Sequence, residues 1–355
     1  MKNYIFKMGK VMKNEVIKKE NYILIDILKF FCAIFVVGIH AGIMNNKDNT
    51  VEWYILHMIL RIAVPFFFIA SGFLFGKKYL KDRSKLKENS VKQIKRLLIP
   101  FIFWMLVSLP YKLITTTGEN VFFIVLKIIR NALFYPWGAL WFLLALIVAI
   151  IIEYWVLKRK RLNVALIIGF ILYGICLLGN SYYFLLEGTC FQNIMDLYLK
   201  IFISMRNGIF EAFPIFTIGV YIATKEKSIE KIKSFKIYIA LLVVLVIQTI
   251  EVTFIRNKNY QDDHSLFVMT IFVVSLLLVL CIKYKNLKFK FLNGNLLRNL
   301  STGVYFMHSP IINYISLLNF SLSNYQMFFI TIGLIMVIYL ILYKVDNKYI
   351  NYVIK

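Results

Sequence analysis

Long apolar stretches alternate with short polar segments along the whole chain. About 20 apolar residues are enough for a helix to cross a bilayer, and ten stretches of this kind can be marked in the sequence. They cover residues 23–44, 54–76, 97–116, 138–157, 163–180, 207–223, 236–255, 265–282, 301–319 and 325–343. The pattern predicts an all-α membrane protein with about ten transmembrane helices.

The distribution of positive charge predicts how these helices are oriented. If the N-terminus is cytoplasmic, 32 of the 42 lysines and arginines fall in cytoplasmic segments and 7 in outer segments. Short loops rich in lysine and arginine stay in the cytoplasm. We therefore expect a multi-pass protein of the cytoplasmic (plasma) membrane, with both termini inside and the lipid bilayer around it. Its predicted parts are a basic N-terminal segment (1–22), one transmembrane domain (23–343) and a tail (344–355).

Composition excludes several classes of protein. Hydrophobic residues make up 60% of the chain and charged residues 17%, which is far from the average of soluble proteins. A net charge of +24 would suggest nucleic acid in a soluble protein. Here the membrane loops explain that charge, so no nucleic-acid partner is expected. The sequence carries no metalloprotease, Walker or dinucleotide motif, and only residues 262–264 (Asp-Asp-His) approach metal-ligand spacing. We predict no metal and no bound cofactor.

The first predicted span carries three ionisable residues, Asp26, Lys29 and His40. Such groups are costly at membrane depth, so they usually face the protein interior and mark function. Lys29 and His40 are eleven residues apart, which places them on one helix face about 16 Å from each other. Histidine titrates near neutral pH, so His40 is a candidate general base near the outer leaflet. An interhelical hydrogen bond is the alternative explanation of His40.

A second buried charge, Arg61, lies well inside the second span and needs an anion. Asp26, Glu251 and a ligand carboxylate or phosphate are the candidates. If the orienting partner of His40 is a carboxylate, it should come from another span, because Asp26 is about 21 Å away on a straight helix. Glu251 is our candidate for that role.

Further polar residues gather near the ends of other predicted spans, where simple solvation is the alternative to a functional role. On the outer side these are Arg206, Asn207, Glu211, Glu251 and Asp263, and closer to the cytoplasm they are Arg96, Tyr305 and His308. We predict one outer cavity and one inner cavity. The outer cavity would contain His40, Arg206, Glu251 and Asp263, and the inner cavity Lys29, Arg96 and His308. Two outer connections, 117–137 and 182–205, mix aromatic and charged residues and are predicted to lie along the membrane interface.

Several motifs, taken in their order, resemble the acyltransferase type 3 family of polytopic membrane acyltransferases. The first is a cation and a histidine separated by ten residues, here Lys29 and His40. The second is an R-x3-P-x-F-F-x-x-S-G pattern, which runs from Arg61 to Gly72. The others are a basic KQIKRLLIP segment (92–100), GALWFLLAL (138–146) and a late Y-x-x-H formed by Tyr305 and His308. The resemblance covers about residues 20–345. Lys29 stands where the family has an arginine, and the family's R-x-x-R appears here as Gln93 to Arg96.

This resemblance implies transfer of an acyl group, commonly acetyl from cytoplasmic acetyl-CoA as co-substrate. The acceptor would be a hydroxyl or amine, for example of a cell-envelope sugar (O-acetylation) or a small amino-acid-like molecule. The resemblance implies that His40 is the catalytic base and that Lys29, Arg61 and Arg96 hold the donor phosphates. Arg206, Asn207, Tyr305 and His308 complete the residues that we expect to bind donor or acceptor.

Within the family, the chain most resembles the membrane half of the vancomycin-resistance serine racemases. LRIAVPFFFIASG, LWFLLALI, MRNGIF and the stretch from Glu251 to DHS carry this resemblance. In those proteins a soluble racemase domain follows; this chain carries no such domain, so we expect no racemase activity from it. A carrier or binding protein for serine or another small amino acid is the alternative function, with Arg61 or Arg206 holding the carboxylate. A non-catalytic sensor or partner subunit is a third hypothesis. Envelope-biosynthesis enzymes or a separate racemase are the expected protein partners.

Overall fold

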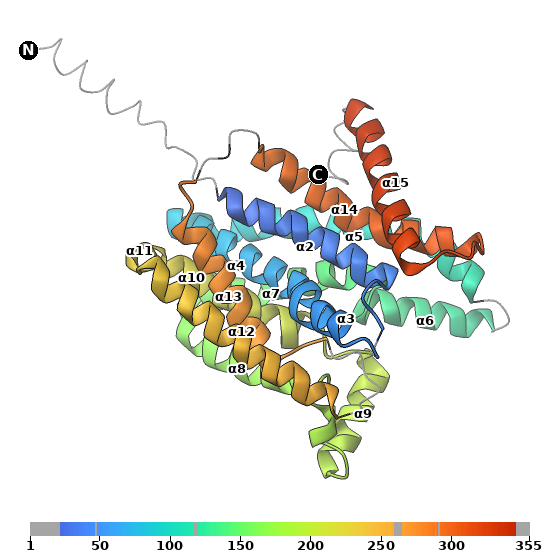
Figure 1. The fold of residues 1–355 in the computed structure, drawn as a ribbon, viewed down its shortest axis with the longest axis horizontal. Helices are drawn as coiled ribbons and strands as arrows, with labels where there is room; N and C mark the ends of the chain where they lie inside the picture. Colours follow the sequence, from blue (N-terminus) through green and yellow to red (C-terminus); the bar gives the residue numbers. More distant parts are fainter. Residues whose placement is uncertain are drawn as a thin grey trace, which may run out of the picture.

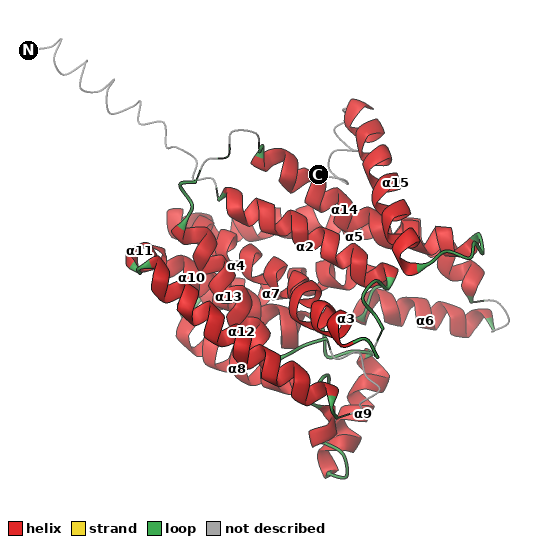
Figure 2. Cartoon of the chain, in the orientation of Figure 1, coloured by secondary structure: helices red, strands yellow, loops and turns green. Residues whose placement is uncertain are grey.

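The computed structural model describes residues 22–46, 48–116, 120–258, 265–287, 289 and 292–345. Helices are the only regular elements within these ranges (Figure 2), which agrees with the predicted all-α class. Most of the predicted N-terminal segment and tail lies outside them. The helices are α2 (Ile23–Ala41), α3 (Thr50–Tyr54), η1 (Ile55–Ile59), η2 (Leu60–Ile62), α4 (Ala63–Lys81), η3 (Arg83–Lys85), α5 (Leu86–Thr115), α6 (Val121–Phe134), η4 (Gly138–Leu140), α7 (Trp141–Lys158), α8 (Leu162–Leu178), η5 (Tyr183–Leu185), α9 (Cys190–Phe202), η6 (Gly208–Ala212), α10 (Phe213–Thr224), α11 (Glu226–Lys231), α12 (Ser234–Arg256), α13 (Val268–Lys283), α14 (Gly294–Leu317) and α15 (Asn324–Val345).

Within the described residues, six helical segments are long and apolar enough to cross a membrane, and three shorter apolar helices accompany them. Together with α14, these helices lie over all ten apolar stretches of the sequence. The chain is therefore a multi-pass membrane protein. The count of ten crossings and the side on which each terminus lies stay predictions. The six long segments are Ile23–Ala41, Thr50–Lys81, Arg83–Thr115, Gly138–Lys158, Ser234–Arg256 and Asn324–Leu342.

The helices divide into a buried centre and an exposed periphery. In the most apolar parts of Thr50–Lys81 and Gly138–Lys158, 61% of the residues are buried, against 17% in α5, α12 and α15. Figure 1 shows α15 at the edge of the bundle. Because lipid tails are as apolar as leucine, such exposed faces suit contact with lipid. A polar site is therefore to be sought among the central helices.

α4 and α10 approach each other more closely than ordinary side chains would allow. A Cβ atom added at Gly72 would lie 2.0 Å from the carbonyl oxygen of Phe216, and one added at Gly219 would lie 2.1 Å from that of Ile69. Small residues let the backbones of membrane helices come into direct contact. These two glycines therefore set the distance between α4, which carries part of the site, and α10.

α2 and α14 lie side by side and run in the same direction (Figure 1). Near the start of α14, Arg298 forms a bidentate ion pair with Asp26, with Nη2–Oδ2 and Nε–Oδ1 distances of 2.8 and 3.1 Å. Further along both helices, the ring centroids of His40 and His308 are 5.1 Å apart. The alternative in which Asp26 balances Arg61 is wrong, because Arg298 occupies the Asp26 carboxylate.

At the other end of the bundle from His40, the buried Glu226 at the start of α11 joins several helices. The Tyr22 hydroxyl before α2 donates to it at 2.8 Å, and the Lys285 ammonium after α13 at 2.9 Å. Lys77 of α4 completes the cluster. Burial alone raises the pKa of Glu226, but the hydrogen bonds from these three groups outweigh burial and hold the pKa below its ordinary value.

We expect Glu226→Gln to lower the stability by about 2 kcal/mol at neutral pH, because the substitution removes the anion that two ammonium groups share. Folding lowers the pKa of Glu226. Its contribution to stability is therefore complete above the unfolded pKa of about 4.3 and is lost as the pH falls through the folded value. Thermal unfolding in detergent should show a gap between wild type and variant that closes below about pH 4.3. A gap that persists in acid would contradict this account, and Glu230→Gln, which removes a more exposed partner of Lys285, should have little effect.

α6 and α9 have no buried residues and present apolar faces on the outside of the bundle. They touch each other where the rings of Phe134 and Phe202 meet edge to face at 4.9 Å. This arrangement agrees with helices along the interface, which stays a prediction. Tyr135 follows α6 directly and Arg206 follows α9 after a short turn, so both helices lead into the wall of the cavity described next.

Candidate active site

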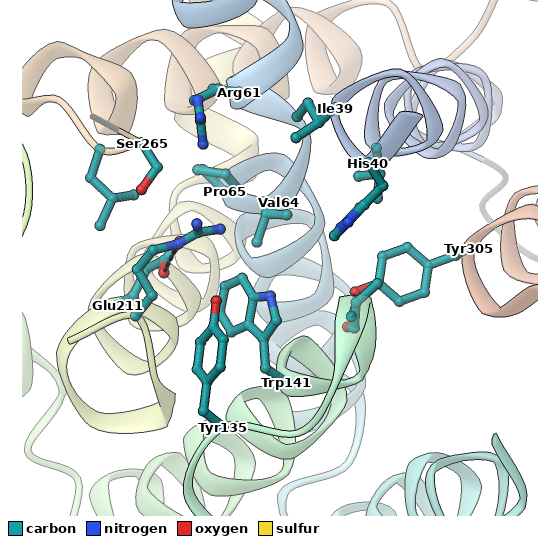
Figure 3. A pocket seen from close by; sticks show the side chains of 15 residues that line it. Ile39, His40, Arg61, Val64, Pro65, Tyr135, Trp141, Glu211, Ser265 and Tyr305 are labelled. Atoms are coloured by element: carbon teal, nitrogen blue, oxygen red, sulfur yellow. Dashed lines mark hydrogen bonds and ion pairs between the residues drawn. The ribbon is translucent and has the colours of Figure 1, made fainter. Parts of the chain in front are cut away.

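A cavity of about 240 Å³ lies between the end of α2, the start of α4, η4, η6 and the segment before α13 (Figure 3). In the figure His40 and Tyr305 lie on one side of the cavity and Glu211 on the other, with Trp141 and Tyr135 between them. The cavity brings together residues from distant parts of the sequence. The residues that line it are Val36, Ile39, His40, Arg61, Val64, Pro65, Tyr135, Gly138, Ala139, Trp141, Arg206, Glu211, Ser265, Leu266 and Tyr305.

Local helix geometry presents the charged side chains to this cavity. His40 is in the last turn of α2, which Gly42 closes in the left-handed conformation (φ 78°). A π-helical turn, η1, precedes Arg61, and a second one, η6, contains Glu211. Such turns shift the direction of the side chains that follow and are frequent at functional sites.

Two guanidinium groups and one carboxylate give the cavity its electrostatic character. Nε of Arg206 is 3.6 Å from Oε2 of Glu211, and the guanidinium carbon of Arg206 is 4.7 Å from the ring centre of Trp141. Glu211 is completely buried, and neither of its carboxylate oxygens accepts a hydrogen bond from the described residues. With Arg61 also in the wall, the cavity has an excess of positive charge. It is suited to an anionic group that a hydrogen-bond donor accompanies.

His40 is the exposed imidazole of the cavity, and an aromatic wall stands behind it. Tyr305 is buried and its hydroxyl donates to the Ala139 carbonyl at 2.6 Å, which fixes its ring. The ring of Tyr305 is 5.8 Å from that of His308. A general base must be able to reach the proton that it removes, and the exposed ring of His40 in the cavity wall allows this.

The structure does not bring Glu251 to His40. Its Oε1 accepts hydrogen bonds from the Tyr182 hydroxyl and the Val268 N–H, both at 2.5 Å, and its Oε2 accepts from the Met269 N–H at 2.9 Å. Glu251 thus caps the first turn of α13, where a carboxylate is favoured by the unpaired N–H groups. The prediction that it orients His40 is wrong, and Glu211 is the carboxylate in the cavity.

The predicted inner cavity does not form around His308. α14 begins at Gly294 and not near 301, so His308 lies about 21 Å along that helix and reaches the level of His40. Lys29 is half-buried, and Asp26 and Arg298 are among its charged neighbours. Arg96 is exposed on α5. Neither Lys29 nor Arg96 lines the cavity.

Two other predicted residues also lie away from the cavity wall. The Asn207 side chain caps η6 by accepting from the N–H groups of Ile209 and Phe210, at 2.9 and 3.1 Å. Its role is therefore to position the π-helical turn that carries Glu211. Asp263, like the rest of 262–264, lies outside the described residues. Among the residues that the structure does describe, no three His, Cys, Asp or Glu side chains gather as a metal site requires.

Three charged or aromatic residues of the cavity wall have no role predicted from the sequence: Glu211, Tyr135 and Trp141. Glu211 follows Arg206 by five residues in a segment already marked by its charges, so a signal for it exists. Trp141 lies in the GALWFLLAL stretch that the family resemblance already marks. Tyr135 carries no such signal, because 32 phenylalanines and 22 tyrosines make aromatic residues common throughout the chain.

The relatives that match the chain are larger proteins. It is 27% identical over 256 residues to an amino-acid racemase of Enterococcus faecalis, covering 71% of this chain and 34% of the relative. It is 26% identical to a second amino-acid racemase of that organism, covering 85% and 43%, and 25% identical to a serine/alanine racemase of Enterococcus gallinarum, covering 73% and 37%. The chain thus spans less than half the length of each relative. No solved structure matches it.

The family comparison covers nearly the whole chain. The model of the acyltransferase type 3 family, described as an acyltransferase domain, matches residues 22–344. That range includes every helix around the cavity, from α2 to α14. The chain belongs to the acyltransferase type 3 family.

Proposed function

We propose that the chain transfers an acyl group, commonly acetyl, from acyl-CoA to a hydroxyl or amine of a small acceptor in this cavity. The observation that carries the proposal is His40, an accessible imidazole in a cavity whose wall also contains Arg61 and Arg206. The family supplies the reaction class. An acceptor from the cell envelope agrees with the predicted position of the cavity at the outer end of the helices.

In this reaction His40 removes the proton from the acceptor hydroxyl or amine. The acceptor oxygen or nitrogen then bonds to the carbonyl carbon of the thioester, the carbon–sulfur bond breaks, and the CoA thiolate takes the proton from His40. Negative charge develops on the carbonyl oxygen in the transition state. The guanidinium groups of Arg61 and Arg206 supply positive charge on the same cavity wall.

Lys29 and Arg96 are the proposed contacts of the donor phosphates on the cytoplasmic side. Lys29 lies on α2 about 16 Å from His40, a distance that the extended pantetheine arm of CoA can span. Asp26, the carboxylate near Lys29, is paired with Arg298. A donor that enters from the cytoplasm would then present its thioester to the cavity from the inner side.

The direct test is acetyl-CoA binding to the purified protein in detergent. We expect Lys29→Ala and Arg96→Ala each to weaken binding about tenfold, because each removes one charged contact to a phosphate. Lys200→Ala is the matched control, since it removes the same charge on α9, near the cavity end of the bundle. Isothermal titration at low salt measures all four proteins. Absence of binding by the wild type at millimolar acetyl-CoA would reject the proposal.

A second candidate function, binding or carriage of a small amino acid, is favoured by one specific observation. The cavity contains both signs of charge needed for a zwitterion: Arg61 or Arg206 for the carboxylate and Glu211 for the ammonium. The racemase names of the relatives agree with an amino-acid ligand. Uptake of serine into vesicles without any acyl-CoA would favour this function, and Glu211→Gln should then weaken serine binding while Lys29→Ala leaves it unchanged.

A further inference from the structure

A hydrogen bond within its own helix fixes the tautomer of His308. Its Nδ1 is 3.1 Å from the carbonyl oxygen of Val304, one turn earlier in α14. A carbonyl oxygen can only accept, so Nδ1 carries the hydrogen, and Nε2 of the neutral ring keeps a lone pair. His308 therefore presents a hydrogen-bond acceptor at Nε2.

That acceptor has no donor in the described part of the chain. His308 is completely buried, and its Nε2 makes no hydrogen bond to any described residue. Buried acceptors are normally satisfied, and an orphan of this kind calls for an explanation. The ring also does not line the cavity, which argues against the expectation that His308 binds donor or acceptor directly.

Two polar rings lie beside His308, those of Tyr305 and His40. The ring of Tyr305 is 5.8 Å away, but its hydroxyl hydrogen is already donated to Ala139. The ring of His40 is 5.1 Å away and carries an N–H on one nitrogen when neutral and on both when protonated. His40 thus lines the cavity and also lies beside the ring that carries the orphan acceptor.

We infer that His308 is a positioning residue for His40 and accepts a hydrogen bond from the inner N–H of His40 through Nε2 while His40 holds the acceptor's proton. The inference rests on the proposed function. The nitrogen of His40 that faces the cavity takes the proton and later gives it to the CoA thiolate. The other nitrogen keeps its own hydrogen throughout, so no proton is transferred to His308. The carboxylate of a serine-protease triad plays a comparable orienting part.

The tautomer of His308 and its response to protonation of His40 can be measured without any acyl transfer. Solid-state ¹⁵N spectra of histidine-labelled protein in lipid vesicles are tractable, because the chain has only 4 histidines. His308 should show Nδ1–H with an unprotonated Nε2. Its Nε2 resonance should shift when His40 becomes protonated, and that shift should vanish in His40→Gln. An Nε2–H tautomer, or a resonance that ignores His40, would overturn the inference.

Kinetics of three variants supply the second readout. In glutamine the side-chain oxygen reaches the place of Nε2, whereas in asparagine it reaches only the place of Nδ1. His308→Asn should lose about 10²-fold in kcat with the KM for acetyl-CoA unchanged, and His308→Gln should recover most of that loss. His57→Gln is the matched control, since the buried His57 also bonds its Nδ1 to the carbonyl four residues earlier, at 2.8 Å. Equal loss in both His308 variants would show that the ring only fills space.

The two readouts separate this inference from the proposed function. If the wild type transfers no acyl group, the proposed function fails, and the spectra still decide whether His308 accepts from His40. If the wild type is active and His308→Asn matches it in kcat, the inference alone fails.

Discussion

Replacing His40 by alanine is expected to reduce acyl transfer about 10³-fold while leaving acetyl-CoA binding unchanged. General-base catalysis is worth roughly 10²–10⁴-fold, and His40 is the accessible imidazole of the cavity. Lys29, the proposed donor contact on the same helix, is about 16 Å away and keeps its surroundings. The measurement is release of free CoA thiol by the purified protein with a panel of envelope sugars and small amino acids.

The pairing of transfer with binding makes this substitution diagnostic. A variant that binds the donor normally and transfers nothing assigns the chemistry to His40. Full activity in His40→Ala would remove the base from the proposed mechanism. If His40→Ala lost both donor binding and acyl transfer, His40 would be a contact of the donor thioester and not the general base.

The second large effect is expected from Gly219→Ala, which should prevent the bundle from assembling. The added methyl carbon would lie 2.1 Å from the Ile69 carbonyl oxygen and 2.8 Å from the Phe73 nitrogen. Both neighbours are backbone atoms of α4, so neither can rotate away, and the helices must separate. Overpacking in a close-packed core costs about 1–3 kcal/mol where side chains can adjust, and this site lies at or beyond the upper end of that range.

Gly174→Ala is the control for this substitution. Beyond the adjacent residues and backbone of its own helix, no described atom lies within 4 Å of the position of its Cβ, although it is also a glycine within an apolar helix. Alanine is favoured over glycine in a helix by about 1 kcal/mol, so this variant should be as stable as the wild type or more stable. Size-exclusion profiles and thermal unfolding in detergent measure both. A monodisperse Gly219→Ala protein with unchanged unfolding would contradict the close α4–α10 contact.

Apolar run length locates the helices of this chain but not their ends. All ten apolar stretches lie on helices, because the energetic cost of polar groups in a bilayer leaves a clear trace in the sequence. The hydrophobicity of a segment indicates whether lipid or water surrounds it. It does not indicate at which residue the helical backbone hydrogen bonding begins. α5 starts at Leu86, well before its apolar stretch begins at 97, in a segment rich in helix-forming lysine. α14 likewise starts early, and that difference moves His308 from the predicted inner cavity to His40.

Because charged residues are costly inside membrane helices, those found in or beside the apolar stretches also predict part of the candidate site. His40, Arg61 and Arg206 stand out in the sequence and meet in one cavity. Glu211 and Glu251 look alike in sequence, as carboxylates near outer span ends. Only the tertiary structure shows that Glu251 meets the N–H groups of α13 whereas Glu211 meets Arg206. The choice between them depends on which donors surround each carboxylate, and helical periodicity carries no information about that.

The two π-helical turns beside the cavity determine how related chains are to be aligned. A π turn contains one more residue than the α-helical turn it replaces, so η1 and η6 are places where a helix gains or loses a single residue without losing its axis. A relative with a regular α-helix in place of η6 would be one residue shorter there. Counting forward from Arg206 without a gap would then match Glu211 to an apolar neighbour. Comparison of cavities across the family must therefore allow single-residue gaps inside membrane helices.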